Sequence, residues 1–138
     1  MTEPTVQAGD HLFVYGTLMQ AIEGNEMSKL LHDNSTHIGT ATMQGRLYKV
    51  SYYPGVIDSD LPTDIVHGDL FRLGDNAAKI MKRLDLYEDI GPPFEAPYEY
   101  RRVLRPVHHG DKTIQAWVYI YNWQLSEDAR IPDGKFRA

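Results

Sequence analysis

The chain has 138 residues, no cysteine and a formal net charge of -5 at pH 7. Its length fits a single domain, and the lack of cysteine excludes disulfides, zinc–thiolate sites and thiol nucleophiles. A negative net charge disfavours binding to nucleic acid, which usually needs a basic patch. No apolar run approaches the roughly 18 residues of a membrane span, and residues 1–10 lack the basic start of a signal peptide. We expect a cytoplasmic protein with no nucleic-acid or membrane partner.

The apolar residues are spaced as in a mixture of strands and helices, which is typical of the α+β class. We expect one domain over residues 11–138, preceded by a flexible tail over residues 1–10. The predicted elements, in chain order, are a strand over residues 11–15, a helix over 24–33, a strand over 38–50, a loop over 52–63, a strand over 65–73, a helix over 76–88, and a hairpin of two strands over 98–107 and 113–121.

Two glycines lie inside predicted strands. Gly45 interrupts the strand over residues 38–50 and is expected to bend it. Gly68 lies within the strand over residues 65–73, where the missing side chain predicts a bulge or the close approach of another segment.

The last predicted strand has an aliphatic face and an aromatic face. Its residues alternate between an aliphatic set and a polar or aromatic set, which are Ile114, Ala116, Val118 and Ile120 against Gln115, Trp117, Tyr119 and Tyr121. Side chains alternate between the two faces of a strand. This strand is therefore expected to be buried on both faces, or to form a cavity wall with its aromatic face.

The residues Tyr15-Gly16-Thr17-Leu18 directly follow the first predicted strand. Gly16 allows the backbone to turn sharply and to approach a ligand closely. Successive backbone N–H groups in such a turn can converge on an anion, and the Thr17 hydroxyl adds a further donor. An ordinary strand-ending turn explains the same residues, because so short a motif has little specificity.

Glu88 ends the predicted helix over residues 76–88. It lies one turn beyond Leu84 and two turns beyond Met81, on the apolar stripe of the helix. Burial on this face and the negative end of the helix dipole both disfavour a charged carboxylate and would raise its pKa. Such a group is suited to accept and return a proton near neutral pH. The alternative is a helix that frays before Glu88 and leaves its side chain in water.

The other polar residues give no comparable signal. His108 and His109 are adjacent in a predicted strand and point to opposite faces, and the remaining histidines lack the spacing of metal ligands. No serine lies in a nucleophile-elbow sequence, and no glycine-rich phosphate loop is present. The sequence therefore predicts no metal site.

Several short motifs follow one another along the chain, and these are Phe13-Val14-Tyr15-Gly16-Thr17-Leu18, Gly45-Arg46-Leu47-Tyr48, Tyr53-Pro54-Gly55, Val66-His67-Gly68-Asp69-Leu70-Phe71, Leu84-Asp85-Leu86-Tyr87-Glu88, Tyr100-Arg101-Arg102-Val103, Trp117-Val118-Tyr119 and Ile131-Pro132-Asp133-Gly134-Lys135-Phe136. In this order and spacing the chain resembles the gamma-glutamylcyclotransferase-like family. Within that family it is similar to the gamma-glutamylamine cyclotransferase branch and its small bacterial relatives. The resemblance covers nearly the whole chain after Asp10.

The resemblance implies a mixed, barrel-like β-sheet with flanking helices. It also implies a cavity walled by the turn at Tyr15, Gly16, Thr17 and Leu18, whose backbone holds the glutamyl carboxylate of a small-molecule gamma-glutamyl substrate. The catalytic glutamate of the family corresponds to Glu88. No metal and no organic cofactor is implied, and the chain is expected to act as a monomer or a homodimer.

The implied reaction is intramolecular aminolysis of a gamma-glutamyl amine or amide, which releases 5-oxoproline and a free amine. Asp89 stands where the family often has glycine, and the stretch over residues 89–97 is peculiar to this chain, which leaves the substrate open. One alternative is a non-catalytic module that binds an acidic small molecule in the same cavity. Another is catalysis on a gamma-glutamyl group carried by a biosynthetic intermediate.

Overall fold

The structure is a computed structural model that describes residues 6–15, 29, 31, 33–50, 54–87 and 100–135, with the backbone alone for residues 84–87. Its elements are β1 (His11–Val14), β2 (Ser35–Gln44), β3 (Arg46–Lys49), β4 (Pro54–Ile57), β5 (Ile65–Leu73), α2 (Ala77–Tyr87), β6 (Tyr100–His109), β7 (Lys112–Tyr121), the short 3-10 helix η2 (Glu127–Ala129) and β8 (Arg130–Ile131). Residues 29, 31 and 33, inside the first predicted helix, are helical. Among the described helices, none is both long and apolar enough to span a membrane.

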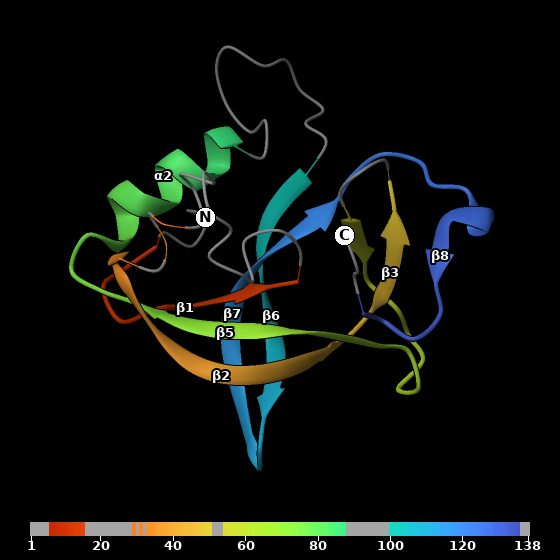
Figure 1. Cartoon of the computed structure of the whole chain (residues 1–138), viewed down its shortest axis with the longest axis horizontal. Coiled ribbons are helices and arrows are strands. Elements are labelled where there is room, and N and C mark those ends of the chain that lie inside the picture. The colour runs from red at the N-terminus through yellow and green to blue at the C-terminus, as the bar shows by residue number, and fades with distance from the viewer. Residues whose placement is uncertain are drawn as a thin grey trace, which may run out of the picture.

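Five strands close into a barrel in the order β1-β5-β2-β6-β7 (Figure 1). The paired neighbours are antiparallel, with the exception of β1 and β7, which run parallel. A second sheet of order β4-β3-β8 lies beside the barrel (Figure 1). This architecture confirms the expected α+β class with a mixed, barrel-like sheet.

The barrel interior is filled by the side chains that alternate inward along its strands. On β7 these are Ala116, Val118 and Ile120, which are at most 2% exposed. Leu47 of β3 and Val56 of β4 belong to the same buried cluster. The smaller sheet therefore shares the core of the barrel, and each such buried aliphatic side chain stabilises the fold by about 1.5–3 kcal/mol.

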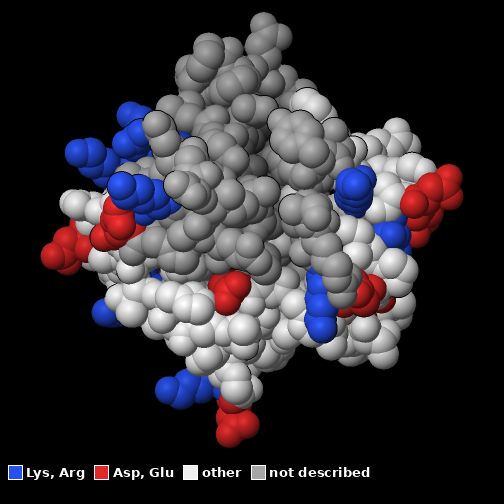
Figure 2. Space-filling view, in the orientation of Figure 1, with Lys and Arg blue, Asp and Glu red and all other residues white. Residues whose placement is uncertain are grey.

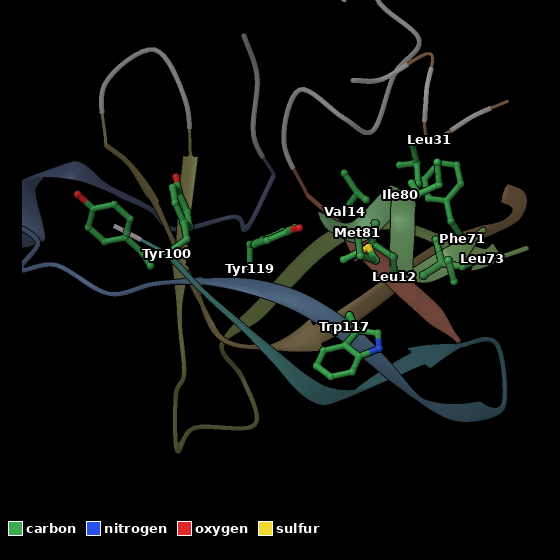
Figure 3. Close-up of a cluster of buried hydrophobic side chains, with 12 residues drawn as sticks. Leu12, Val14, Leu31, Phe71, Leu73, Ile80, Met81, Tyr100, Trp117 and Tyr119 are labelled. Carbon is green, nitrogen blue, oxygen red and sulfur yellow. The ribbon is translucent and has the colours of Figure 1, made fainter. Parts of the chain in front are cut away.

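Helix α2 covers the outer face of the barrel. Ala77, Ile80 and Met81 recur at helical spacing, are at most 5% exposed, and pack in one cluster with Leu12 and Val14 of β1 (Figure 3). The opposite face of the helix carries the exposed basic residues Lys79, Lys82 and Arg83, and basic side chains gather over α2 in Figure 2. The helix is thus held by one apolar stripe, as its sequence predicts.

Most elements agree with the sequence-based predictions. The single strand predicted over residues 38–50 is wrong in part, because Gly45 lies between two strands, β2 and β3, that belong to different sheets. Gly68 permits a close approach, because a Cβ atom there would lie 2.3 Å from the carbonyl oxygen of Val14. The predicted loop over residues 52–63 is wrong in part, since Pro54–Ile57 forms β4. Pro54 is tolerated as the first residue of a strand, and Gly55 packs against the ring of Tyr121, 2.9 Å from where its Cβ would be.

The segment expected to be a tail, residues 1–10, is described from residue 6 onwards. In this part the backbone N–H of Gly9 donates to the carbonyl of Leu73 at 2.9 Å, and the N–H of Leu73 donates to the carbonyl of Asp10 at 2.7 Å. Trp117 of β7 donates its indole N–H to the Asp10 carboxylate at 3.0 Å. These hydrogen bonds attach residues 9 and 10 to the barrel immediately before β1 begins.

Candidate active site

The parallel pair β1 and β7 is short. Its register joins His11 to Ala116 and Leu12 to Trp117, whereas β1 continues to Val14 and β7 to Tyr121. The two strands therefore stop pairing with each other before either of them ends.

Tyr15 directly follows β1. Its side chain is 6% exposed, and its hydroxyl donates a hydrogen bond to the backbone carbonyl of Tyr119, which is 5% exposed. The Tyr15 ring also packs against Phe13, with 6.4 Å between ring centroids and 35° between ring planes. The side chain of Tyr15 is therefore directed into the protein, and its hydroxyl links the end of β1 to β7.

The rest of the predicted anion-binding turn, Gly16, Thr17 and Leu18, lies outside the described residues. Its anion-binding role therefore stays a prediction. The structure does place the start of the turn at the carboxyl end of a barrel strand. An anion-binding loop needs this placement, because its N–H groups must not be consumed by strand pairing.

The C-terminal segment lies along β5, near the end of β1. The last pair between β1 and β5 joins Val14 to Asp69, and the next N–H of β5 on that edge, from His67, donates to the carbonyl of Gly134 at 2.9 Å. Gly134 has φ +68°, and a Cβ atom there would lie 1.8 Å from the carbonyl oxygen of Ile65. The segment around Gly134 therefore occupies the edge of β5 that β1 leaves after Val14.

The aromatic face of β7 is buried, as expected for a strand covered on both sides. Trp117, Tyr119 and Tyr121 are 3%, 5% and 7% exposed, whereas Gln115 is exposed. This face lies in the cluster covered by α2, and Figure 3 shows Tyr119 between Tyr100 and the aliphatic side chains around Met81. The burial is confirmed, while the expectation that these residues line a cleft beside Glu88 stays a prediction.

Aromatic and cationic contacts hold the aromatic face of β7 in place. The guanidinium of Arg102 lies 4.7 Å from the centre of the Trp117 ring, a cation–π contact. Tyr100 meets Tyr121 edge to face at 5.3 Å and donates its hydroxyl to the carbonyl of Pro54 at 2.5 Å. These contacts fix β6, β7 and β4 to one another.

Helix α2 is described as far as Tyr87, one residue before Glu88, so the predicted catalytic carboxylate lies outside the described residues. The buried positions Ala77, Ile80 and Met81 confirm the apolar stripe from which the position of Glu88 was predicted. Glu88 is seven positions after Met81 in the sequence, which corresponds to about two helical turns. A helix that continued by one residue would place Glu88 on the stripe that faces the barrel.

Among the described residues, two aspartates beside the smaller sheet have lowered pKa values. Hydrogen bonds from Ser59 and Arg46 lower the pKa of Asp64 to about 2, and Arg130 adds a further ion pair at 2.8 Å. A hydrogen bond from Arg105 lowers the pKa of Asp58. These groups connect β3, β8 and the loop before β5, and so stabilise the fold.

Sequence reasoning did not find Tyr119 as the partner of Tyr15, because the two residues lie 104 positions apart. It also found no role for Gly134 beyond its place in a terminal motif. The available signal was the combination of Asp133 and Gly134, which is typical of a turn that needs a positive φ.

The closed barrel of this protein, with α2 packed on its outer face, has the gamma-glutamylcyclotransferase-like fold. A family model described as "Gamma-glutamyl cyclotransferase, AIG2-like" matches residues 12–138, and the chain belongs to this family. No curated protein sequence matches the chain.

Solved structures with the same fold come from distant organisms. An AIG2-like protein from Mus musculus is 18% identical, with a TM-score of 0.69 over 95% of this chain and 90% of that one. YkqA from Bacillus subtilis is 23% identical, with a TM-score of 0.67 over 93% of this chain, which spans 39% of the length of YkqA. An uncharacterised protein from Pyrococcus horikoshii is 18% identical, with a TM-score of 0.61 over 92% of this chain and 89% of that one. At these identities the likeness shows the fold alone.

Proposed function

We propose that this protein is a cyclotransferase that acts on a gamma-glutamyl amine or amide and releases 5-oxoproline and a free amine. The observation that carries the proposal is the family match over residues 12–138, a range that includes both the Tyr15–Leu18 turn and Glu88. The position of Tyr15 supports it, since Tyr15 directly follows β1, beyond the last pair that β1 forms with β7.

In the proposed reaction the alpha-amino nitrogen of the substrate attacks its own gamma-carbonyl carbon. A five-membered ring forms, and the bond from that carbon to the departing amine breaks. The attacking amine is protonated at neutral pH and must lose one proton before attack, and the ring nitrogen loses a second proton after attack. Glu88 carries one proton at a time: the departing nitrogen receives one as its bond to carbon breaks, and the released amine takes up the other to become an ammonium ion. The reaction therefore consumes no net proton and needs no co-reactant.

The main task of the protein is to hold the substrate folded back on itself. Positioning of this kind can lower a barrier by up to about 7–11 kcal/mol. In this proposal the backbone N–H groups of Gly16, Thr17 and Leu18 bind the alpha-carboxylate of the substrate, which fixes the amine beside the gamma-carbonyl. A neighbouring N–H group stabilises the oxyanion that develops on the gamma-carbonyl oxygen.

Resemblance to the gamma-glutamylamine branch favours a leaving group that is a simple amine over an amino acid. Asp89 and the proline-rich stretch over residues 92–97 follow Glu88 directly in the sequence. We assign the choice of leaving amine to this stretch, because it departs from the family pattern beside the catalytic residue.

The competing function is a module that binds an acidic small molecule without turnover. Such a binder gains nothing from a carboxylate at Glu88 beside an anion-binding turn, because the charge of Glu88 and the charge of the bound acidic ligand repel each other. This argument favours an enzyme over a passive binder. Catalysis on a gamma-glutamyl group of a larger biosynthetic intermediate needs the same residues and differs in the leaving group alone.

The test is release of 5-oxoproline from a panel of gamma-glutamyl amines, gamma-glutamyl dipeptides and matched alpha-glutamyl amides. The alpha-glutamyl isomers are the control, because attack on their amide carbonyl would close a strained three-membered ring. The proposal expects turnover of at least one gamma-glutamyl compound and of no alpha-glutamyl isomer. Binding of gamma-glutamyl compounds without any 5-oxoproline would instead establish the non-catalytic module.

A further inference from the structure

A row of three polar side chains crosses one end of the barrel. Arg72 of β5 pairs with His11 of β1 on one side and with Thr36 of β2 on the other. Residues paired across neighbouring strands point to the same face, and His11 also pairs with Ala116, whose side chain lies in the barrel interior. The row therefore lies at one mouth of the barrel, where β1 and β2 begin and β5 ends, at the left of Figure 1.

The guanidinium of Arg72 lies against the backbone of Gly9, shortly before β1. A Cβ atom added at Gly9 would lie 3.4 Å from Nη2 of Arg72 and 4.0 Å from its Cζ. Gly9 has φ +87°, and its N–H donates to the carbonyl of Leu73 at 2.9 Å. The contact with Gly9 places the guanidinium on the β1 side of the row, which is the side of His11.

In the part of the chain that the structure describes, no carboxylate pairs with Arg72. Three other arginines each bind an aspartate at 2.7 or 2.8 Å, whereas Arg72 takes part in no described ion pair. Asp10, which directly precedes His11, accepts hydrogen bonds from the indole N–H of Trp117 and from the backbone N–H of Gln7. The nearest acid in the sequence is therefore engaged elsewhere.

Arg72 and His11 are two basic groups set side by side. Burial and the charge of Arg72 lower the pKa of His11, and the opposing effect of Asp10 is smaller. On its other side His11 meets Ala116 of β7, which supplies no compensating charge. Like charges directly opposite each other on neighbouring strands destabilise a sheet, and a bound anion would offset this repulsion.

From this arrangement we propose that Arg72, His11 and Thr36 form a binding site for a phosphate group, at the opposite end of β1 from Tyr15. The guanidinium fork matches two phosphate oxygens, the imidazole adds an N–H donor, and the Thr36 hydroxyl adds a neutral donor. The same chemistry binds the free ion or the phosphate of a monoester. The site is independent of the proposed function, because none of its residues belongs to the candidate active site.

The test is isothermal titration of the full chain with sodium phosphate, at neutral pH and constant ionic strength. Arg72→Gln should weaken binding at least about tenfold, the size of one charge-assisted hydrogen bond. The matched control is Arg83→Gln, which removes the same charge from an exposed arginine of α2 and should bind as the parent does. No binding by the parent, or equal affinities in all three proteins, would overturn the proposal.

A second measurement locates the anion. Phosphate should raise the pKa of the His11 imidazole in the parent, as followed by NMR, because an anion beside Arg72 stabilises the imidazolium. Thr36→Val keeps the shape of the side chain, removes the hydroxyl and should weaken binding severalfold, which tests the row without changing its charge. Binding that leaves the His11 signals unchanged would place the ion elsewhere and refute the site.

Other anions identify what the site recognises. Glycerol 3-phosphate in place of the free ion separates the two sources of a phosphate group: tighter binding of the ester indicates a phosphorylated compound, and tighter binding of the free ion indicates inorganic phosphate. Either result keeps the site. Sodium acetate is the control for charge alone, because its carboxylate offers two oxygens in one plane. Acetate that bound as tightly as phosphate would show an unselective basic patch and refute the proposal.

Discussion

Asp64 accepts a hydrogen bond from Arg46 Nε at 2.7 Å, and this pair joins the smaller sheet to the barrel. Arg46 begins β3, whereas Asp64 directly precedes β5. The second oxygen of Asp64 binds Arg130 of β8 at 2.8 Å, and Ser59 donates to the first at 2.6 Å. One partly buried carboxylate thus connects three segments of the chain.

Acid should weaken this connection. The folded-state pKa of Asp64, about 2, lies below the 3.8 of an unperturbed aspartate, so its contribution to stability is fully present above the unfolded pKa. That contribution is lost as the pH falls from about 4 to 2. We expect Asp64→Asn to be less stable than the parent at neutral pH, with the difference shrinking across this acid range. Urea unfolding at a series of pH values measures it.

The control for Asp64 is the exposed Asp60 in the same loop. Asp60→Asn should follow the parent curve at every pH. If Asp64→Asn also followed the parent curve, the ion pairs around Asp64 would contribute nothing to folding.

Gly134 offers a test of how the C-terminal segment is attached. Gly134→Ala introduces a Cβ at a left-handed φ of +68°, 1.8 Å from a backbone oxygen. The conformation alone costs about 1–2 kcal/mol, and overpacking adds about 1–3 kcal/mol. We therefore expect the free energy of unfolding to fall by at least about 2 kcal/mol, as measured by denaturant titration.

Gly110 supplies the matched control for Gly134. It has φ +59°, and a Cβ atom added there would have no heavy atom within 4 Å. Gly110→Ala should show the conformational cost without the steric one. Equal losses in the two variants would mean that the C-terminal segment yields without cost and does not brace the edge of β5.

Local sequence pattern was sufficient for the elements that bury one regular face. The strand over residues 65–73 and the stripe Ala77, Ile80 and Met81 were predictable because their periods are long enough to read. The strand Pro54–Ile57 was missed because proline and glycine are typical of loops, although here they begin an edge strand and admit Tyr121. The two-residue strand Arg130–Ile131 is too short to show any period.

The candidate site was predictable as a set of residue types and not as an arrangement. Tyr15 could be recognised from the four-residue turn that it begins, but nothing local indicates that its hydroxyl meets the Tyr119 carbonyl. That contact depends on barrel closure, which makes the first and last barrel strands neighbours. Closure is a property of the whole sheet and has no signature in a short window of sequence.

Gly16 tests whether the turn binds an anion through its backbone. We expect Gly16→Val to weaken binding of the substrate far more than Thr17→Ser does, because a branched side chain obstructs the close approach of backbone to carboxylate. Isothermal titration with 5-oxoproline, the proposed product, measures the affinity without turnover. Equal and small effects of both substitutions would argue against an amide site at this turn.

Glu88 is the residue on which the proposed chemistry depends most directly. Glu88→Gln keeps the shape of the side chain and removes the proton acceptor, so turnover should fall by roughly 10²–10⁴, the usual size of general-base loss. The fold should not suffer, because a neutral amide suits the apolar stripe on which the sequence predicts Glu88 to lie at least as well as a carboxylate does. Release of 5-oxoproline and the thermal midpoint, measured on the same preparation, separate these two effects.

The control is Asp85→Asn, because the helical period of the sequence predicts Asp85 to lie away from the stripe of Met81 and Glu88. It removes one negative charge close to Glu88 in sequence and should leave turnover nearly unchanged. Full activity in Glu88→Gln would refute the mechanism. A large fall in its thermal midpoint, with the remaining folded protein fully active, would instead make Glu88 a structural hydrogen-bond partner. A loss of turnover in both variants would show that the local charge, and not the proton acceptor at Glu88, controls the reaction.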